Sequence, residues 1–167
     1  MQYTSAEANK LLRKLREEEM FIRRHEADAS SFNAALGEDI ESVRPDYDFA
    51  RTAAALEEVQ RKMRAVKHAI NVFNTTRMIG GMTIDEVLIR LPQLKNRKEQ
   101  LAEMAMAQPK ERVRAYGSGM STVIDYRYAN YDVAEVKAEF ERVTEEISSL
   151  QLELDRVNAT ETMEIPL

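Results

Sequence analysis

The sequence predicts an all-α fold in the main, an antiparallel bundle of long coiled-coil-like helices with one short β-hairpin insertion. Apolar residues recur at alternating steps of three and four over long stretches, as in helices that pair along one narrow apolar seam. Thr or Asp stands three positions before Glu at three expected helix starts, which is capping-box spacing. A single long segment, 109–131, breaks the helical pattern.

The clearest seam lies in the last long segment, for which we predict a helix over about 133–158. Asp132 and Glu135 supply its N-terminal cap signal. The apolar positions follow heptad steps without a break: Val133, Val136, Phe140, Val143, Ile147, Leu150, Leu154 and Val157. A seam of this length is stable only when other helices cover it, so we expect Phe140, Ile147 and Leu150 to be buried.

The first helix is predicted over about 5–33. Thr4 and Glu7 have the spacing of a capping box at its start. Its apolar side follows heptad steps: Ala8, Leu11, Leu15, Ile22 and Ala29. Glu18 and His25 interrupt the seam, and polar seam residues of this kind lower stability while they fix register and partner number.

The second helix is predicted over about 47–74. Pro45 prevents an earlier start, and Asp46 is the candidate N-cap. The seam of this helix comprises seven heptad positions: Phe49, Leu56, Val59, Met63, Val66, Ile70 and Phe73. Its basic residues lie away from the seam, so they are expected to face solvent.

The third helix is predicted over about 84–108. Gly80-Gly81 favours a tight turn before it, and Thr83 with Glu86 forms another capping box. Its seam positions are Ile84, Val87, Leu91, Leu94, Leu101 and Ala105. Pro92 lies inside this range, but the apolar register continues on both sides, which favours one bent helix.

The non-helical segment concentrates arginine and tyrosine, and we predict a hairpin over about 111–128. Arginine and tyrosine are enriched at binding hot spots, so this segment is the candidate interaction surface. The residues that define it are Arg112, Arg114, Tyr116, Tyr126, Arg127 and Tyr128. The alternative is a hairpin that pairs with its copy in a neighbouring subunit.

Composition and charge set limits on the class of protein. The 167 residues fit a single helical domain over 1–167, with 44% apolar residues for a core. The net charge of -5 gives no reason to expect nucleic acid or an anionic membrane as partner. No secretory leader and no apolar run of membrane-spanning length is visible, so we expect a cytoplasmic protein.

No segment carries a specific chemical signature. The absence of cysteine removes thiol nucleophiles and cysteine-ligated zinc. The two histidines, His25 and His68, lack the spacing of known helical metal sites. The two Gly-containing turns lack the remaining residues of a P-loop or a dinucleotide fingerprint. We therefore predict no catalytic residue, no metal and no cofactor, and we do not expect an enzyme.

Two helix ends share a pattern of asparagine and threonine, formed by Asn71, Asn74 and Thr76 in one and by Asn158 and Thr160 in the other. Such residues are typical of polar helix ends, and the sharper alternative is a polar site where the two ends meet. Together with the Gly turn and the Thr-capped helix that follows it, this pattern resembles the septicolysin-like family of small helical bacterial proteins. The resemblance covers most of the chain and implies a helical bacterial protein, and the family name suggests a cytolysin.

These observations favour a structural or protein-interaction protein that assembles with itself, because thin apolar seams suit helix pairing between chains. Another protein is a second candidate partner. The alternative is a membrane-active, cytolysin-like protein, which rests on the family resemblance alone. The mixed charges on the polar helix faces argue against membrane binding, since interfacial helices are commonly basic there.

Overall fold

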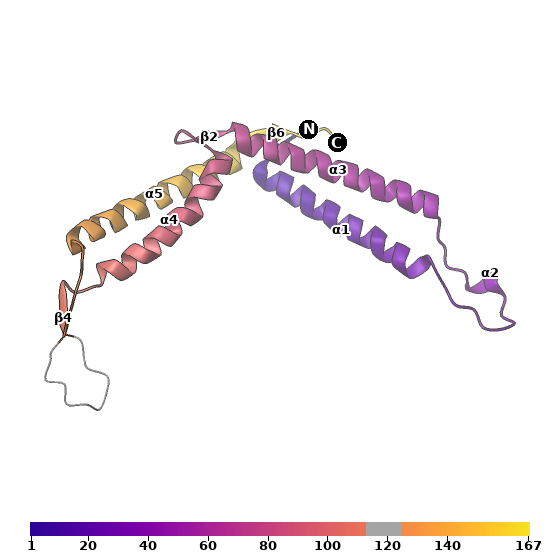
Figure 1. Cartoon of the computed structure of the whole chain (residues 1–167). Helices are drawn as coiled ribbons and strands as arrows, with labels where there is room; N and C mark the ends of the chain where they lie inside the picture. The colour runs from indigo at the N-terminus through magenta and orange to yellow at the C-terminus, as the bar shows by residue number, and fades with distance from the viewer. Residues whose placement is uncertain (113–124) are drawn as a thin grey trace, which may run out of the picture. The chain divides into compact units, whose positions relative to one another are not determined.

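The computed structural model describes residues 1–112 and 125–167, and these form a mainly helical protein (Figure 1). Helices α1 (Ser5–Ala29), α3 (Phe49–Thr76), α4 (Ile84–Ala105) and α5 (Val133–Thr160) are long, and α2 (Ile40–Val43) is a single turn. The predicted helical class is thus confirmed. The helix ends differ by a few residues from prediction, most at α1, which ends at Ala29 rather than near residue 33.

Three short antiparallel strand pairs accompany the helices where the sequence predicted one. Strand β1 (Gln2–Thr4) pairs with β6 (Thr162–Glu164), β2 (Met78–Ile79) with β3 (Met82–Thr83), and β4 (Lys110–Arg112) with β5 (Tyr126–Tyr128). The restriction to a single hairpin was wrong. Strands of two or three residues are too short to show alternating hydrophobicity, and the β1–β6 pair joins distant segments.

The chain divides into two compact units, one made of residues 1–76 and 156–167 and the other of residues 77–155. The first unit contains α1, α3 and the β1–β6 ribbon. The second contains α4, most of α5, and the β2–β3 and β4–β5 ribbons.

Helices α1 and α3 form the antiparallel hairpin of the first unit. Thr4 and Glu7 close the predicted capping box at the start of α1, with the Thr4 amide donating to the Glu7 carboxylate at 2.8 Å. This bond lowers the pKa of Glu7. The N-cap expected at Asp46 is instead at Asp48, whose carboxylate accepts from the Arg51 amide at 3.0 Å.

The core of the first unit follows the predicted seams in part. Ala8, Leu15 and Ala29 of α1 are buried, but Leu12 is buried where Leu11 was expected. On α3 the predicted positions from Val59 to Phe73 are buried or half-buried. Phe49 was predicted in the seam but is 69% exposed, so the start of α3 leaves this aromatic ring in solvent.

Helices α4 and α5 form the antiparallel hairpin of the second unit. Gly80 and Gly81, with φ of 56° and 86°, make the two-residue turn between β2 and β3, which positive φ values permit. The capping box of Thr83 and Glu86 then starts α4 as predicted. Pro92 lies inside this helix, which continues to Ala105.

The seam of the second unit agrees closely with the sequence. Five predicted positions of α4 are buried, namely Ile84, Val87, Leu91, Leu94 and Leu101. On α5, Ile147 and Leu150 are buried within the chain, and Phe140 is half-buried under the ammonium group of Lys98.

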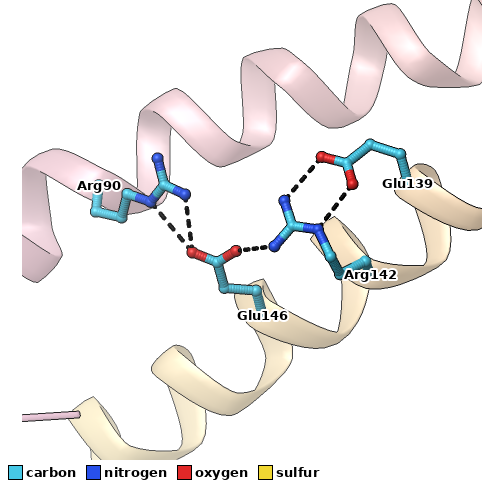
Figure 2. A network of polar contacts seen from close by, with 4 residues as sticks. All are labelled: Arg90, Glu139, Arg142 and Glu146. Carbon is cyan, nitrogen blue, oxygen red and sulfur yellow. Dashed lines mark hydrogen bonds and ion pairs between the residues drawn. The ribbon is translucent and has the colours of Figure 1, made fainter. Parts of the chain in front are cut away.

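A charged network joins the two helices of the second unit (Figure 2). Arg90 of α4 donates two hydrogen bonds to one oxygen of Glu146 on α5, at 3.1 and 3.0 Å. Arg142 donates to the other Glu146 oxygen at 3.0 Å and holds Glu139 at 2.7 Å, which lowers the pKa of Glu139. Glu146 therefore bridges an arginine on each helix.

Candidate interaction surface on the β4–β5 ribbon

Four of the predicted interaction residues lie in one antiparallel ribbon. Arg112 belongs to β4, while Tyr126, Arg127 and Tyr128 form β5. Arg114 and Tyr116 lie outside the described residues, so the structure gives no account of them. An added backbone hydrogen bond from the Ala129 amide to the Pro109 carbonyl, at 3.2 Å, extends the pairing beyond the strands.

The register of the ribbon sorts its side chains onto two faces. Lys110 is opposite Tyr128 and Arg112 is opposite Tyr126, and alternation along a strand places all four on the same face. Glu111 and Arg127 are opposite each other and occupy the other face. We call the face formed by Lys110, Arg112, Tyr126 and Tyr128 the Lys–Tyr face.

The Lys–Tyr face is held together by cation–π contacts. The Lys110 ammonium nitrogen lies 4.2 Å from the ring centroid of Tyr126 and 5.5 Å from that of Tyr128. Both rings nevertheless remain open to solvent, with exposed fractions of 45% and 61%. The face thus presents two cations and two aromatic rings, and it includes no carboxylate among the ribbon residues that the structure describes.

Lys110 lies beside the predicted arginines and tyrosines in the sequence but was not included in the predicted interaction surface, although it makes both cation–π contacts. The signal that could have identified it is its spacing of two from Arg112, which places both side chains on the same side of a strand. The strand was predicted to start one residue later, so Lys110 was left outside it.

A groove of about 430 Å³ lies beside the opposite face of the ribbon. The residues that line it come from the end of α4 and the segment after it, from Glu111, Arg127 and Tyr128 of the ribbon, and from the turn before α5. Tyr131 fixes one wall, since its hydroxyl donates to the Met104 carbonyl at 3.1 Å. Met106 also lines the groove and is 77% exposed, so the groove combines an apolar side chain with two carboxylates, Glu103 and Glu111, and one cation, Arg127.

The asparagine and threonine residues at the helix ends all belong to the first unit. Asn71, Asn74 and Thr76 end α3, and Asn158 and Thr160 end α5. The Thr76 hydroxyl donates to the Val72 carbonyl at 2.6 Å, and the Thr160 hydroxyl donates to the Arg156 carbonyl at 2.8 Å. Each hydroxyl therefore bonds to the preceding turn of its own helix.

Within 1–112 and 125–167, no three His, Asp or Glu side chains come together as metal ligands. None of the helices described there combines the length and apolar character needed to cross a bilayer.

Comparison with known proteins identifies one similar fold. A crystal structure of a functionally unknown conserved protein from Corynebacterium diphtheriae matches with a TM-score of 0.55 and 15% sequence identity. The match covers 98% of this chain and 100% of the other. No protein-family model and no curated protein matches the sequence. At this identity the similarity shows the fold alone.

Proposed function

We propose that this chain is a protein-interaction protein whose Lys–Tyr face binds an acidic segment of a partner. The observation that carries the proposal is the exposed ribbon face that joins Lys110 and Arg112 to two tyrosine rings, with no carboxylate among its described residues. Acidic side chains complement this charge, and tyrosine supplies contact area at low entropic cost. A ribbon of two strands also offers open edges for an extended peptide.

A protein segment suits this face better than nucleic acid. The chain has a net charge of -5, and two cations are few for binding a phosphate backbone. The Lys110 ammonium lies over the Tyr126 and Tyr128 rings, which restricts those rings as stacking platforms for bases.

The test compares two double variants with equal changes in charge. Lys110→Glu with Arg112→Glu reverses the Lys–Tyr face, while Lys95→Glu with Arg97→Glu reverses exposed cations on α4. Fluorescence anisotropy would use Glu-rich peptides, Lys-rich peptides and single-stranded DNA as probes. We expect the Glu-rich peptides to bind the parent and the α4 variant, and to lose affinity for the ribbon variant. Selective binding of DNA, or equal binding by both variants, would contradict the proposal.

Self-assembly is a second proposal, and exposed apolar side chains favour it. Ile147 and Leu150 are covered inside one chain, so the α5 seam requires no second copy. Large apolar side chains such as Met20, Phe21 and Phe49 remain more than half exposed on the α1–α3 hairpin. Light scattering should give a mass at least twice 19.2 kDa if these side chains mediate assembly.

A membrane-active role stays an alternative proposal, supported by the resemblance to the septicolysin-like family. Leakage of dye from vesicles that contain anionic lipid is the direct test. Leakage at protein concentrations where the chain is monomeric would favour this role over self-assembly, because the exposed apolar side chains would then insert into lipid.

A further inference from the structure

The outward side of α1 carries an ordered set of exposed residues. Its buried residues, Ala8, Leu12, Leu15 and Ala29, face the α1–α3 hairpin. At 3.6 residues per turn, a stripe roughly 100° wide on the opposite side begins with the exposed Ala6 and Lys10 and continues over six more exposed residues. In chain order these are Arg13, Glu17, Met20, Phe21, Arg24 and Asp28. We call this stripe the α1 outer face.

The centre of the α1 outer face is apolar. Met20 and Phe21 are 63% and 74% exposed, in a helix that otherwise directs its large apolar side chains inward. Together with Glu17 and Arg24 they line a surface groove of about 260 Å³. Adjacent exposed side chains of this size are typical of a contact surface rather than of a solvated helix face.

The charges around this centre are arranged so that the stripe complements itself when reversed. Read forward, the signs are plus at Arg13, minus at Glu17, plus at Arg24 and minus at Asp28. Read backward, every plus falls opposite a minus. These four side chains make no ion pair within the described part of the chain, whereas Arg23 and Glu19 on another side of α1 do pair.

We propose that the α1 outer face binds a second copy of the same face, with the two helices antiparallel about a two-fold axis between Met20 and Phe21. Glu17 of each copy then faces Arg24 of the other, and Arg13 faces Asp28. Met20 and Phe21 of both copies then cluster around the axis at the centre. This inference rests on the self-assembly proposal and assigns it a surface.

A parallel pairing would place like charges opposite each other at all four charged positions, which disfavours it. Pairing within the helix is the competing explanation, because Arg13 with Glu17 and Arg24 with Asp28 have i,i+4 spacing. An experiment must therefore separate attraction between two chains from attraction inside one chain.

Single charge reversals, followed by mixing of the two variants, distinguish attraction between two chains from attraction inside one chain. Glu17→Arg leaves only cations at positions 17 and 24, and Arg24→Glu leaves only anions there. Each variant alone should weaken self-association by about tenfold or more in analytical ultracentrifugation. An equimolar mixture should associate as a heterodimer, since both contacts become attractive again. The double variant Glu17→Arg with Arg24→Glu should associate like the parent.

Matched controls use exposed charges of α5. Glu141→Arg and Lys137→Glu change the net charge by the same amounts, and we expect neither to alter self-association. Phe21→Ser should abolish association while circular dichroism keeps its helical signal, because this side chain is exposed in the single chain.

The absence of cysteine allows the orientation to be tested directly. Met20→Cys should form an oxidised dimer, because position 20 lies beside its own copy across the axis. Arg13→Cys should not, because each position 13 would lie about 22 Å along the axis from its copy, beyond the reach of a disulfide. Mixing Arg13→Cys with Asp28→Cys should restore cross-linking.

The outcomes separate this inference from the proposals on which it rests. If the parent protein is monomeric, both the self-assembly proposal and the proposed α1 contact are wrong. A dimeric parent that is unaffected by the charge reversals, or that cross-links through Arg13→Cys alone, would overturn the α1 contact and leave self-assembly standing. A monomer that binds vesicles and loses this binding in Phe21→Ser would assign the face to lipid instead.

Discussion

Each unit contains an antiparallel helical hairpin, but the distance between the two paired helices differs between the units. The α-carbons of α1 and α3 approach within 8 Å along their hairpin, whereas those of α4 and α5 rarely come so close. The buried residues explain the difference. Ala8, Ala29 and Ala69 are buried in the first unit, while the buried positions described in the second unit hold Val, Leu and Ile. Small side chains allow closer approach, because interaxial distance follows the side chains at the contact.

The spacing also determines which polar side chains can bridge the helices. In the closer hairpin, the Gln60 amide donates to Glu19 at 2.9 Å and the Tyr47 hydroxyl donates to Glu26 at 3.3 Å. In the wider hairpin, two of the longest side chains reach across, Arg90 to Glu146 and Lys98 to the Phe140 ring. Helix spacing therefore depends on the core residues, and the bridging chemistry depends on the spacing.

Leu101→Ala should give the largest effect, because it removes a large side chain from the wider core. Leu101 is 1% exposed, and we expect a loss of about 2–5 kcal/mol in the free energy of unfolding. Leu88→Ala on the same helix is the control, since Leu88 is 46% exposed. Urea denaturation measures both, and equal losses would contradict the packing described for α4.

The converse substitution tests the closer hairpin. Ala8→Leu adds volume where Ala8 is fully buried, and we expect a loss of about 1–3 kcal/mol. Ala6→Leu adds the same volume at an exposed position of the same turn and should change stability little. If Ala8→Leu were as well tolerated as Ala6→Leu in denaturation curves, close approach would not depend on alanine.

Thr144→Val should stabilise the wider hairpin. The Thr144 hydroxyl is buried and makes no hydrogen bond with any described residue. Removing an unsatisfied buried hydroxyl should raise the free energy of unfolding by about 1 kcal/mol. Ser148→Ala is the control, because the Ser148 hydroxyl already donates to the Thr144 carbonyl at 3.0 Å. A destabilised Thr144→Val variant would show that this hydroxyl is in fact bonded.

The ion pair that bridges the wider hairpin should contribute less. A double-mutant cycle with Arg90→Met and Glu146→Gln should give a coupling of roughly 0.2–1 kcal/mol, since both side chains are partly exposed. The coupling should shrink in high salt. A coupling that is insensitive to salt would indicate that the side chains interact mainly through packing.

The smallest effect concerns pH on the outer surface of the closer hairpin. The hydrogen bonds from Arg61 lower the pKa of Glu58 from 4.5 to about 2. A carboxyl whose pKa is lower in the folded state stabilises the fold above pH 4.5, and this contribution disappears as pH falls through about 2. Glu58→Gln should therefore lose slightly less stability than the parent on acidification, measured by thermal denaturation at stepped pH.

Local signals in the sequence predicted much of this fold. The capping boxes at Thr4 and Thr83 and the cap at Asp132 depend on neighbouring residues only, and all three occur as predicted. The seam positions predicted for α4 and α5 were also accurate, since all of them are buried or half-buried. The β1–β6 pair joins residues such as Gln2 and Glu164, so no local pattern could indicate it.

The candidate surface was predicted only in part, because composition is visible in the sequence whereas strand register is not. Composition identified the Arg- and Tyr-rich segment, but the strand register decides that Lys110 joins Tyr126 and Tyr128 on one face. Burial on α1 likewise depends on how α3 lies against it, which selected Leu12 over Leu11. Heptad spacing left that choice open, since both residues border the same seam.

The single narrow seam in each hairpin has a thermal consequence. In the part of the chain that the structure describes, no polar or charged residue is buried as a whole, and most buried residues lie along the seams of the two hairpins. Unfolding therefore exposes little apolar surface per residue, so the heat-capacity change should fall below the roughly 12–15 cal/mol/K per residue of globular domains. A small heat-capacity change flattens the dependence of stability on temperature. Calorimetry should find a shallow curve, with stability nearly constant over a wide range below the melting temperature.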